Sequence, residues 1–98
     1  MSGNITLRQL RAFQAVMTTG SVTAAAEKLH LTQPALSKQL TGLEDVLGLR
    51  LFHRRSGMTI TPTHEGVAFY KAIEATLENI ENLPELAEEV ARSNRRRL

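Results

Sequence analysis

Residues 21–47, which read SVTAAAEKLHLTQPALSKQLTGLEDVL, constrain the fold of this chain more than any other segment. The second half of the segment carries leucines at i, i+4, i+7 and i+11 from Leu36, a spacing that forms one narrow apolar stripe on a helix. The first half is short and contains three consecutive alanines, which leave room for another helix to cross close by. The pattern predicts a helix-turn-helix, with helices over residues 22–29 and 33–47.

The ends of both helices carry suitable residues. Ser21 and Thr32 are good N-caps, and Pro34 sits in the first turn of the second helix, where its missing N–H costs nothing. In the turn, His30 takes the place where many such motifs have glycine. Histidine enters the left-handed backbone region more readily than most residues, so this departure is tolerable.

The face of the second helix opposite its leucines carries small polar groups and one lysine. Gln bonds adenine bidentately, Ser and Thr bond several base edges, and Lys reaches guanine or a phosphate. A solvated surface is the ordinary interpretation of one polar helix face, but the alanine-rich helix before it favours a recognition helix in the DNA major groove. The predicted base-reading residues are Gln33, Pro34, Ser37 and Lys38.

Further elements are expected on both sides of the motif. Thr6 and Gln9 form a capping-box pair for a helix over residues 6–18, which Gly20 closes. Short β-like runs flank residues 54–57, which predicts a two-stranded wing near residues 51–61. An arginine pair at the wing base suits phosphates or a narrow minor groove, although such pairs are usually only surface charge. The predicted contacts to the DNA backbone are Ser21, Thr23, Thr32, Thr41, Arg54 and Arg55.

The fold class expected is therefore mainly α, a winged helix-turn-helix of three helices and a two-stranded wing over residues 1–62. Residues 63–92 should form a long linker helix that Thr63 caps, and residues 93–98 a flexible tail. Pro84 predicts a kink or a second short helix. The predicted core consists of Leu10, Phe13, Ala25, Leu29, Leu36, Leu40, Leu43 and Phe52.

The linker helix carries a second apolar stripe at a/d spacing, which a domain this small cannot cover. A symmetric partner helix is implied, and with it a homodimer on a pseudo-palindromic operator. The predicted dimerisation residues are Tyr70, Ile73, Leu77 and Ile80.

Charge and composition agree with a DNA-binding role. Residues 1–64 contain seven Lys or Arg against three Asp or Glu, residues 65–91 one Lys against seven Glu, and residues 92–98 four Arg. The basic N-terminal block suits phosphate contact, and the acidic segment should point away from DNA.

Composition also bears on location and chemistry. The chain has no cysteine, no apolar run long enough to span a membrane and no signal-peptide pattern, which allows a cytoplasmic location. The three histidines are scattered, with no H-E-x-x-H or comparable spacing, and no glycine-rich phosphate loop is present. We therefore expect no catalytic residue, no metal site and no cofactor.

The run AAAEKLHLTQPALSKQLTGLEDVLGLRLFHR resembles the N-terminal domain of LysR-type transcriptional regulators. The resemblance implies a sequence-specific regulator whose linker helix pairs across a two-fold axis. It also implies a larger C-terminal effector-binding domain, absent from this chain, which would bind the small-molecule effector. The shared elements are Q-P-A-L-S at Gln33–Ser37, L-E at Leu43–Glu44, L-G-x-x-L-F at Leu47–Phe52, T-x-x-G at Thr63–Gly66, and L-R-Q-L-R-A-F before the motif.

Two alternatives remain open from the sequence. One is another winged-helix DNA binder, such as the DNA-binding domain of a molybdate-responsive regulator. The other is a winged helix used as a protein-interaction module. The basic, small-residue recognition face favours DNA over protein as the partner.

Overall fold

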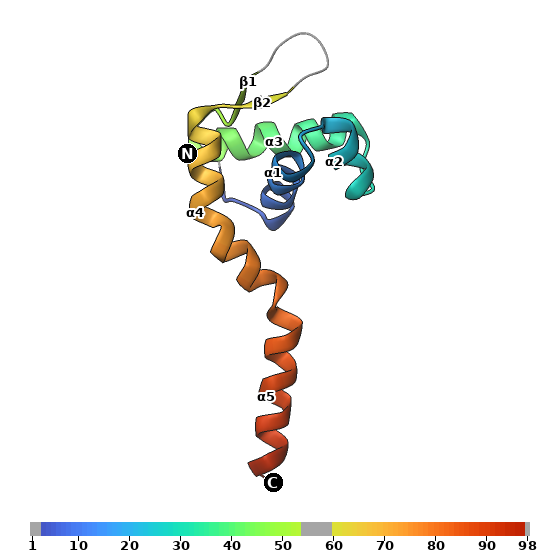
Figure 1. Cartoon of the computed structure of the whole chain (residues 1–98), viewed down its shortest axis with the longest axis vertical. Helices are drawn as coiled ribbons and strands as arrows, with labels where there is room; N and C mark the ends of the chain where they lie inside the picture. The colour runs from blue at the N-terminus through green and yellow to red at the C-terminus, as the bar shows by residue number, and fades with distance from the viewer. Residues whose placement is uncertain (1–2, 54–59, 98) are drawn as a thin grey trace.

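The computed structural model describes residues 3–53 and 60–97, which form a helical head with a two-stranded wing and a long helical extension (Figure 1). The three N-terminal helices make the head, the strands lie at one end of it, and the last two helices lead away from it. This is the expected winged helix-turn-helix. The described elements are α1 (Leu7–Thr19), α2 (Val22–Lys28), α3 (Gln33–Leu47), β1 (Phe52–His53), β2 (Thr61–Pro62), α4 (His64–Glu81) and α5 (Leu83–Arg97).

Side chains just outside the helices start them where the sequence predicts. The backbone N–H of Thr6 donates to Gln9 Oε1 at 3.0 Å, and the N–H of Gln9 donates to Thr6 Oγ1 at 3.1 Å, which completes the capping box of α1. Thr63 caps α4 by accepting from the N–H of Gly66 at 2.9 Å. His30 has a φ of 57° and so takes the left-handed position of the turn, as expected.

The core lies between α1, α2, α3 and the base of the wing. The ring of Phe13 is at its centre, with ring centroids 5.6 Å from those of Phe52 and Phe69 and 6.0 Å from that of Tyr70. Six of the eight predicted core residues are buried, whereas Leu10 and Leu29 are only partly buried at its edge. Leu51 is fully buried and was not predicted.

The wing strands are short and antiparallel, with Phe52 opposite Pro62 and His53 opposite Thr61. They lie within the predicted hairpin, except that β2 ends one residue later. The two wing arginines, Arg54 and Arg55, lie outside the described residues.

Part of the α4 stripe is covered by the chain itself, contrary to expectation. Tyr70 and Ile73 pack against the core of the head, and Leu77 is only 3% exposed. Ile80 is half-buried. The premise that the stripe lacks an intramolecular partner is therefore wrong for Tyr70, Ile73 and Leu77, because this part of α4 lies against the head rather than projecting from it.

The extension also differs from the prediction after Asn82. Pro84 does interrupt the helix, but α5 runs for 15 residues to Arg97 instead of ending at Arg92 before a flexible tail. Proline is tolerated in the first turn of a helix, and arginines in the last turn favour the negative end of the helix dipole. The most exposed large apolar side chains of the described residues follow the break, on α5: Leu83, Leu86 and Val90, at 52%, 53% and 62%.

Candidate nucleic-acid interface

The polar face of α3 is exposed along its length, whereas Leu36, Leu40 and Leu43 on its other face are fully buried. This face lines a groove of about 540 Å³ that lies between the start of α1 and most of the length of α3. Of the predicted base-reading residues, three lie in the groove, and Gln33 is exposed at the start of the helix. The groove is lined by Gln9, Pro34, Ser37, Lys38, Gln39, Thr41, Gly42 and Asp45.

The starts of α2 and α3 meet through one side-chain hydrogen bond. Gln33 Nε2 donates to Thr23 Oγ1 at 3.0 Å, and both residues are exposed. The sequence indicated each residue separately, one for bases and one for phosphates. Their contact could not be predicted from spacing, because it depends on how the two helices cross.

Two of the predicted phosphate contacts also hold helices in place. Ser21 Oγ accepts from the N–H of Ala24 at 3.1 Å, and Thr32 Oγ1 accepts from the N–H of Ala35 at 3.2 Å. A hydroxyl that accepts in this way keeps its own proton for donation. Both side chains therefore retain the capacity to bond an anion.

A junction between α3, the wing and α4 was missed by the sequence analysis. Glu44 Oε2 accepts from the backbone N–H groups of Leu51 and Phe52 at 2.7 and 3.3 Å. On the other side, Thr63 Oγ1 donates to the carbonyl of Arg50 at 2.6 Å, and its N–H donates to Leu51 O at 2.9 Å. The segment before β1 is thus held from both α3 and α4, and this fixes the base of the wing relative to α3.

Replacing Glu44 with Ala should lower the free energy of unfolding by roughly 1–3 kcal/mol, because it leaves part-buried N–H donors without an acceptor. Glu44→Gln should cost less, since its amide oxygen can still accept. Chemical denaturation of the three proteins measures the difference. Equal stability of wild type and the alanine variant would show that water replaces the carboxylate at no cost.

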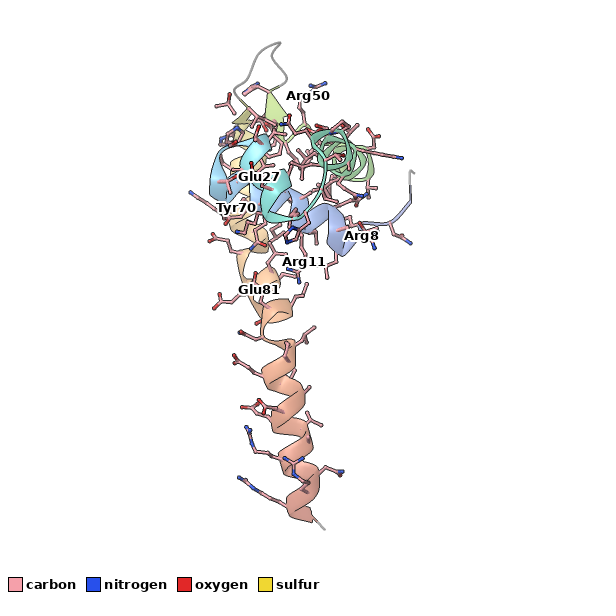
Figure 2. The ribbon with its side chains drawn as sticks, turned by 90° about the vertical axis from the view of Figure 1, so that its right-hand side faces the viewer. Arg8, Arg11, Glu27, Arg50, Tyr70 and Glu81 are labelled. Carbon is pink, nitrogen blue, oxygen red and sulfur yellow. The ribbon has the colours of Figure 1, made fainter. Side chains whose placement is uncertain are left out.

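Charged side chains divide the molecule into two parts. Figure 2 shows Arg50 at the wing end of the head and Arg8 and Arg11 along α1, whereas Glu81 lies on the extension. The extension up to Ala91 is strongly acidic in sequence. The surface available to a polyanion is therefore the head, which carries the exposed face of α3.

The described residues contain no helix that is both long and apolar enough to cross a membrane. Within the same residues, no three histidine, aspartate or glutamate side chains are grouped so that they could hold a metal ion.

Known proteins share this arrangement. HTH-type transcriptional regulator BsdA of Bacillus subtilis (strain 168) is 44% identical over 89 residues, which are 87% of this chain and 31% of BsdA. The structure titled BenM_DBD/benA site 1 DNA complex superposes with a TM-score of 0.79 at 38% identity, covering 88% of this chain and 96% of that one. The CbnR_DBD–DNA complex gives a TM-score of 0.76 at 34% identity, covering 86% and 95%.

The chain spans less than a third of the length of curated relatives such as BsdA and the regulatory protein NocR of Agrobacterium fabrum (strain C58 / ATCC 33970). Residues 7–67 match the family profile described as "Bacterial regulatory helix-turn-helix protein, lysR family". The match extends from α1 to the first turn of α4 and so includes the turn, the recognition helix and the wing. The chain belongs to the LysR family of bacterial regulatory helix-turn-helix proteins.

Proposed function

We propose that this chain is the DNA-binding part of a transcriptional regulator and that it reads the major groove with α3. The observation that carries the proposal is the exposed polar face at the start of α3, above a fully buried leucine stripe. Similarity to the BenM and CbnR domains, whose structures are DNA complexes, supports it. Gln33, Pro34, Ser37 and Lys38 are the side chains proposed to approach base edges.

Contacts to the phosphate backbone are proposed for the hydroxyl groups around this face and for the wing. Ser21 and Thr23 at the start of α2, Thr32 just before α3 and Thr41 on its exposed face are half-buried or exposed. Arg54 and Arg55 of the wing are proposed as further phosphate contacts on the basis of the sequence. These contacts position the helix in the groove and carry little sequence information of their own.

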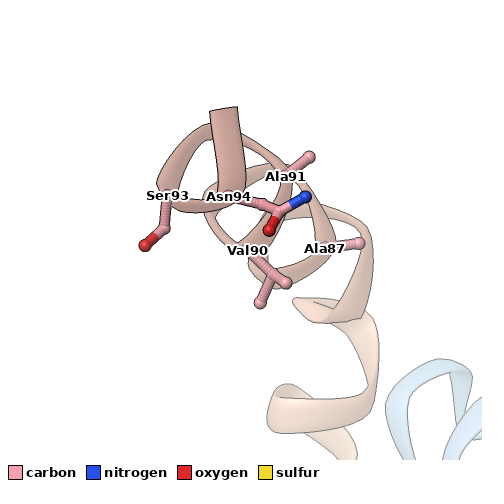
Figure 3. Close-up of a pocket in the computed structure, with 5 residues that line it drawn as sticks. All are labelled: Ala87, Val90, Ala91, Ser93 and Asn94. Atoms are coloured by element: carbon pink, nitrogen blue, oxygen red, sulfur yellow. The ribbon is translucent and has the colours of Figure 1, made fainter. Parts of the chain in front are cut away.

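We propose that two copies pair through α5, with the half-buried Ile80 at the edge of the contact. Leu83, Leu86 and Val90 form an exposed apolar face at helical spacing, which isolated surface residues would not give. Short side chains lie beside its C-terminal end. Figure 3 shows Ala87, Ala91 and Asn94 around a depression of about 460 Å³ beside Val90.

Charge and side-chain size along α5 favour an antiparallel pair. The first half carries Glu85, Glu88 and Glu89, and the second half carries arginines from Arg92 onward. Antiparallel packing brings acidic against basic halves and seats the large leucines of one copy against the small residues of the other. A parallel pair would oppose like charges along its whole length.

Such a dimer would present to DNA two recognition helices that are related by a two-fold axis. Its operator should be pseudo-palindromic, with half-sites separated by about one helical turn or a multiple of it. We further propose a cytoplasmic location, where bacterial DNA lies, and a role in binding rather than catalysis. In a longer protein of the size of the curated relatives, a small-molecule effector would bind to the additional domain.

Binding of the chain to mixed-sequence duplex should weaken steeply with salt, since phosphate contacts release counterions. On a selected operator, Gln33→Ala should reduce the binding preference at one base pair by about 1–3 kcal/mol and change the preference at the other base pairs less. Fluorescence anisotropy over a salt series and a set of single-base operator variants measures both effects. If the chain did not bind DNA, or bound it with an affinity that did not depend on salt, the protein-interaction alternative would be favoured. If Gln33→Ala weakened binding equally on every sequence, Gln33 would be a phosphate contact and not a base contact.

A further inference from the structure

We propose that Thr23 is a positioning residue that fixes the side-chain amide of Gln33 and thereby makes α3 select adenine over guanine. The inference rests on the proposed function, because it requires Gln33 to face a base pair. The inference adds to the proposed function the base that Gln33 selects and the residue that determines this selection.

The geometry begins with the 3.0 Å contact between Gln33 Nε2 and Thr23 Oγ1. With one of its two N–H groups donated to Thr23, the amide still has one N–H and the carbonyl oxygen Oε1. These two atoms form a donor beside an acceptor. That pair is complementary to the major-groove edge of adenine, which offers N6–H as donor and N7 as acceptor.

The reverse orientation of the amide would read a different base. If Gln33 Oε1 faced Thr23 and accepted its hydroxyl proton, only N–H donors would point outward. Guanine presents two acceptors, O6 and N7, and would then be the better partner. The orientation of one amide therefore separates adenine from guanine.

Thr23 has the chemistry to decide this orientation on DNA. A threonine inside a helix can donate its hydroxyl proton to the backbone carbonyl four residues earlier. For Thr23 that residue is Thr19, which belongs to α1, so Thr23 lacks this acceptor. Its single proton can go to a phosphate oxygen, which only accepts. Once that proton is donated, Oγ1 can only accept, so the nitrogen of Gln33 must be the atom that faces it.

The test uses the full chain and operators that differ only at the base pair where Gln33→Ala relaxes the preference. Wild type should prefer adenine to guanine there by at least about fivefold. Thr23→Val keeps the shape of the side chain without the hydroxyl and should reduce the preference about fivefold or more. Thr23→Ser keeps the hydroxyl and should rescue it.

A combined variant separates positioning from general loss of affinity. In a Gln33→Ala background, Thr23→Val should weaken binding to all operators equally, since no amide remains to orient. A wild-type preference for guanine, or a Thr23→Val protein that binds less tightly but keeps the full adenine preference, would overturn the inference. Absence of any sequence preference in wild type would instead count against the proposed function itself.

Discussion

Replacing Leu86 with Asp should convert the chain to a monomer and abolish tight binding to a two-half-site operator. Leu86 is 53% exposed in the single chain, so the substitution leaves the core of the head intact. In a symmetric α5 pair it would bury two unpaired carboxylates, each of which costs several kcal/mol. The dissociation constant of the dimer should rise at least about 100-fold, because every 1.4 kcal/mol is a factor of ten.

Sedimentation velocity at micromolar concentration measures the change in assembly, and binding to operators with one or two half-sites measures its consequence. Binding to a single half-site should be unaffected by Leu86→Asp. Ala75→Asp is a matched control, since it adds the same carboxylate at an exposed position of α4, outside the proposed contact through α5. If the Leu86→Asp variant still sedimented as a dimer, the two copies would not pair through α5.

The proposed contact through α5 illustrates what the sequence pattern could not decide. The a/d spacing of Tyr70, Ile73 and Leu77 correctly indicated an apolar face on a long helix. Spacing cannot distinguish a face covered by the chain's own core from one covered by a second copy. The ring of Phe13, 57 residues before that of Tyr70 and 6.0 Å from it in space, decides the question for the first half of α4.

Features governed by near neighbours were predictable. The N-caps Thr6, Ser21, Thr32 and Thr63 each bond a backbone N–H three residues ahead, so a short window of sequence contains the whole interaction. The leucine stripe of α3 is equally local. The exposed face that these elements create was therefore predicted with the correct residues exposed.

Features that join distant segments were not predictable. The carboxylate of Glu44 lies seven residues before the first N–H that it accepts from, across the end of a helix and a turn. The contact between Thr23 and Gln33 spans ten residues and two helices. Neither has a sequence periodicity, since each depends on the crossing of elements whose angle only the packed core sets.

Replacing Gly66 with Ala should lower the free energy of unfolding by about 3 kcal/mol or more. A Cβ atom at this position would lie 2.2 Å from the carbonyl oxygen of Leu51, which is a backbone atom held at the junction by Glu44 and Thr63. Neither α4 nor the start of the wing can retreat without breaking those bonds. The higher helix propensity of alanine, worth about 1 kcal/mol, does not offset the overlap.

Gly42→Ala is the matched control, because it makes the same substitution inside α3. Its Cβ would meet only the side chain of Gln9, whose Nε2 atom, 3.0 Å away, is the end of a flexible side chain. The gain in helix propensity opposes a partial loss of the α1 cap, so stability should stay within about 1 kcal/mol of wild type. Thermal and urea unfolding of both variants provide the comparison. If Gly66→Ala proved as stable as Gly42→Ala, the close approach of α4 to the backbone of Leu51 would be contradicted.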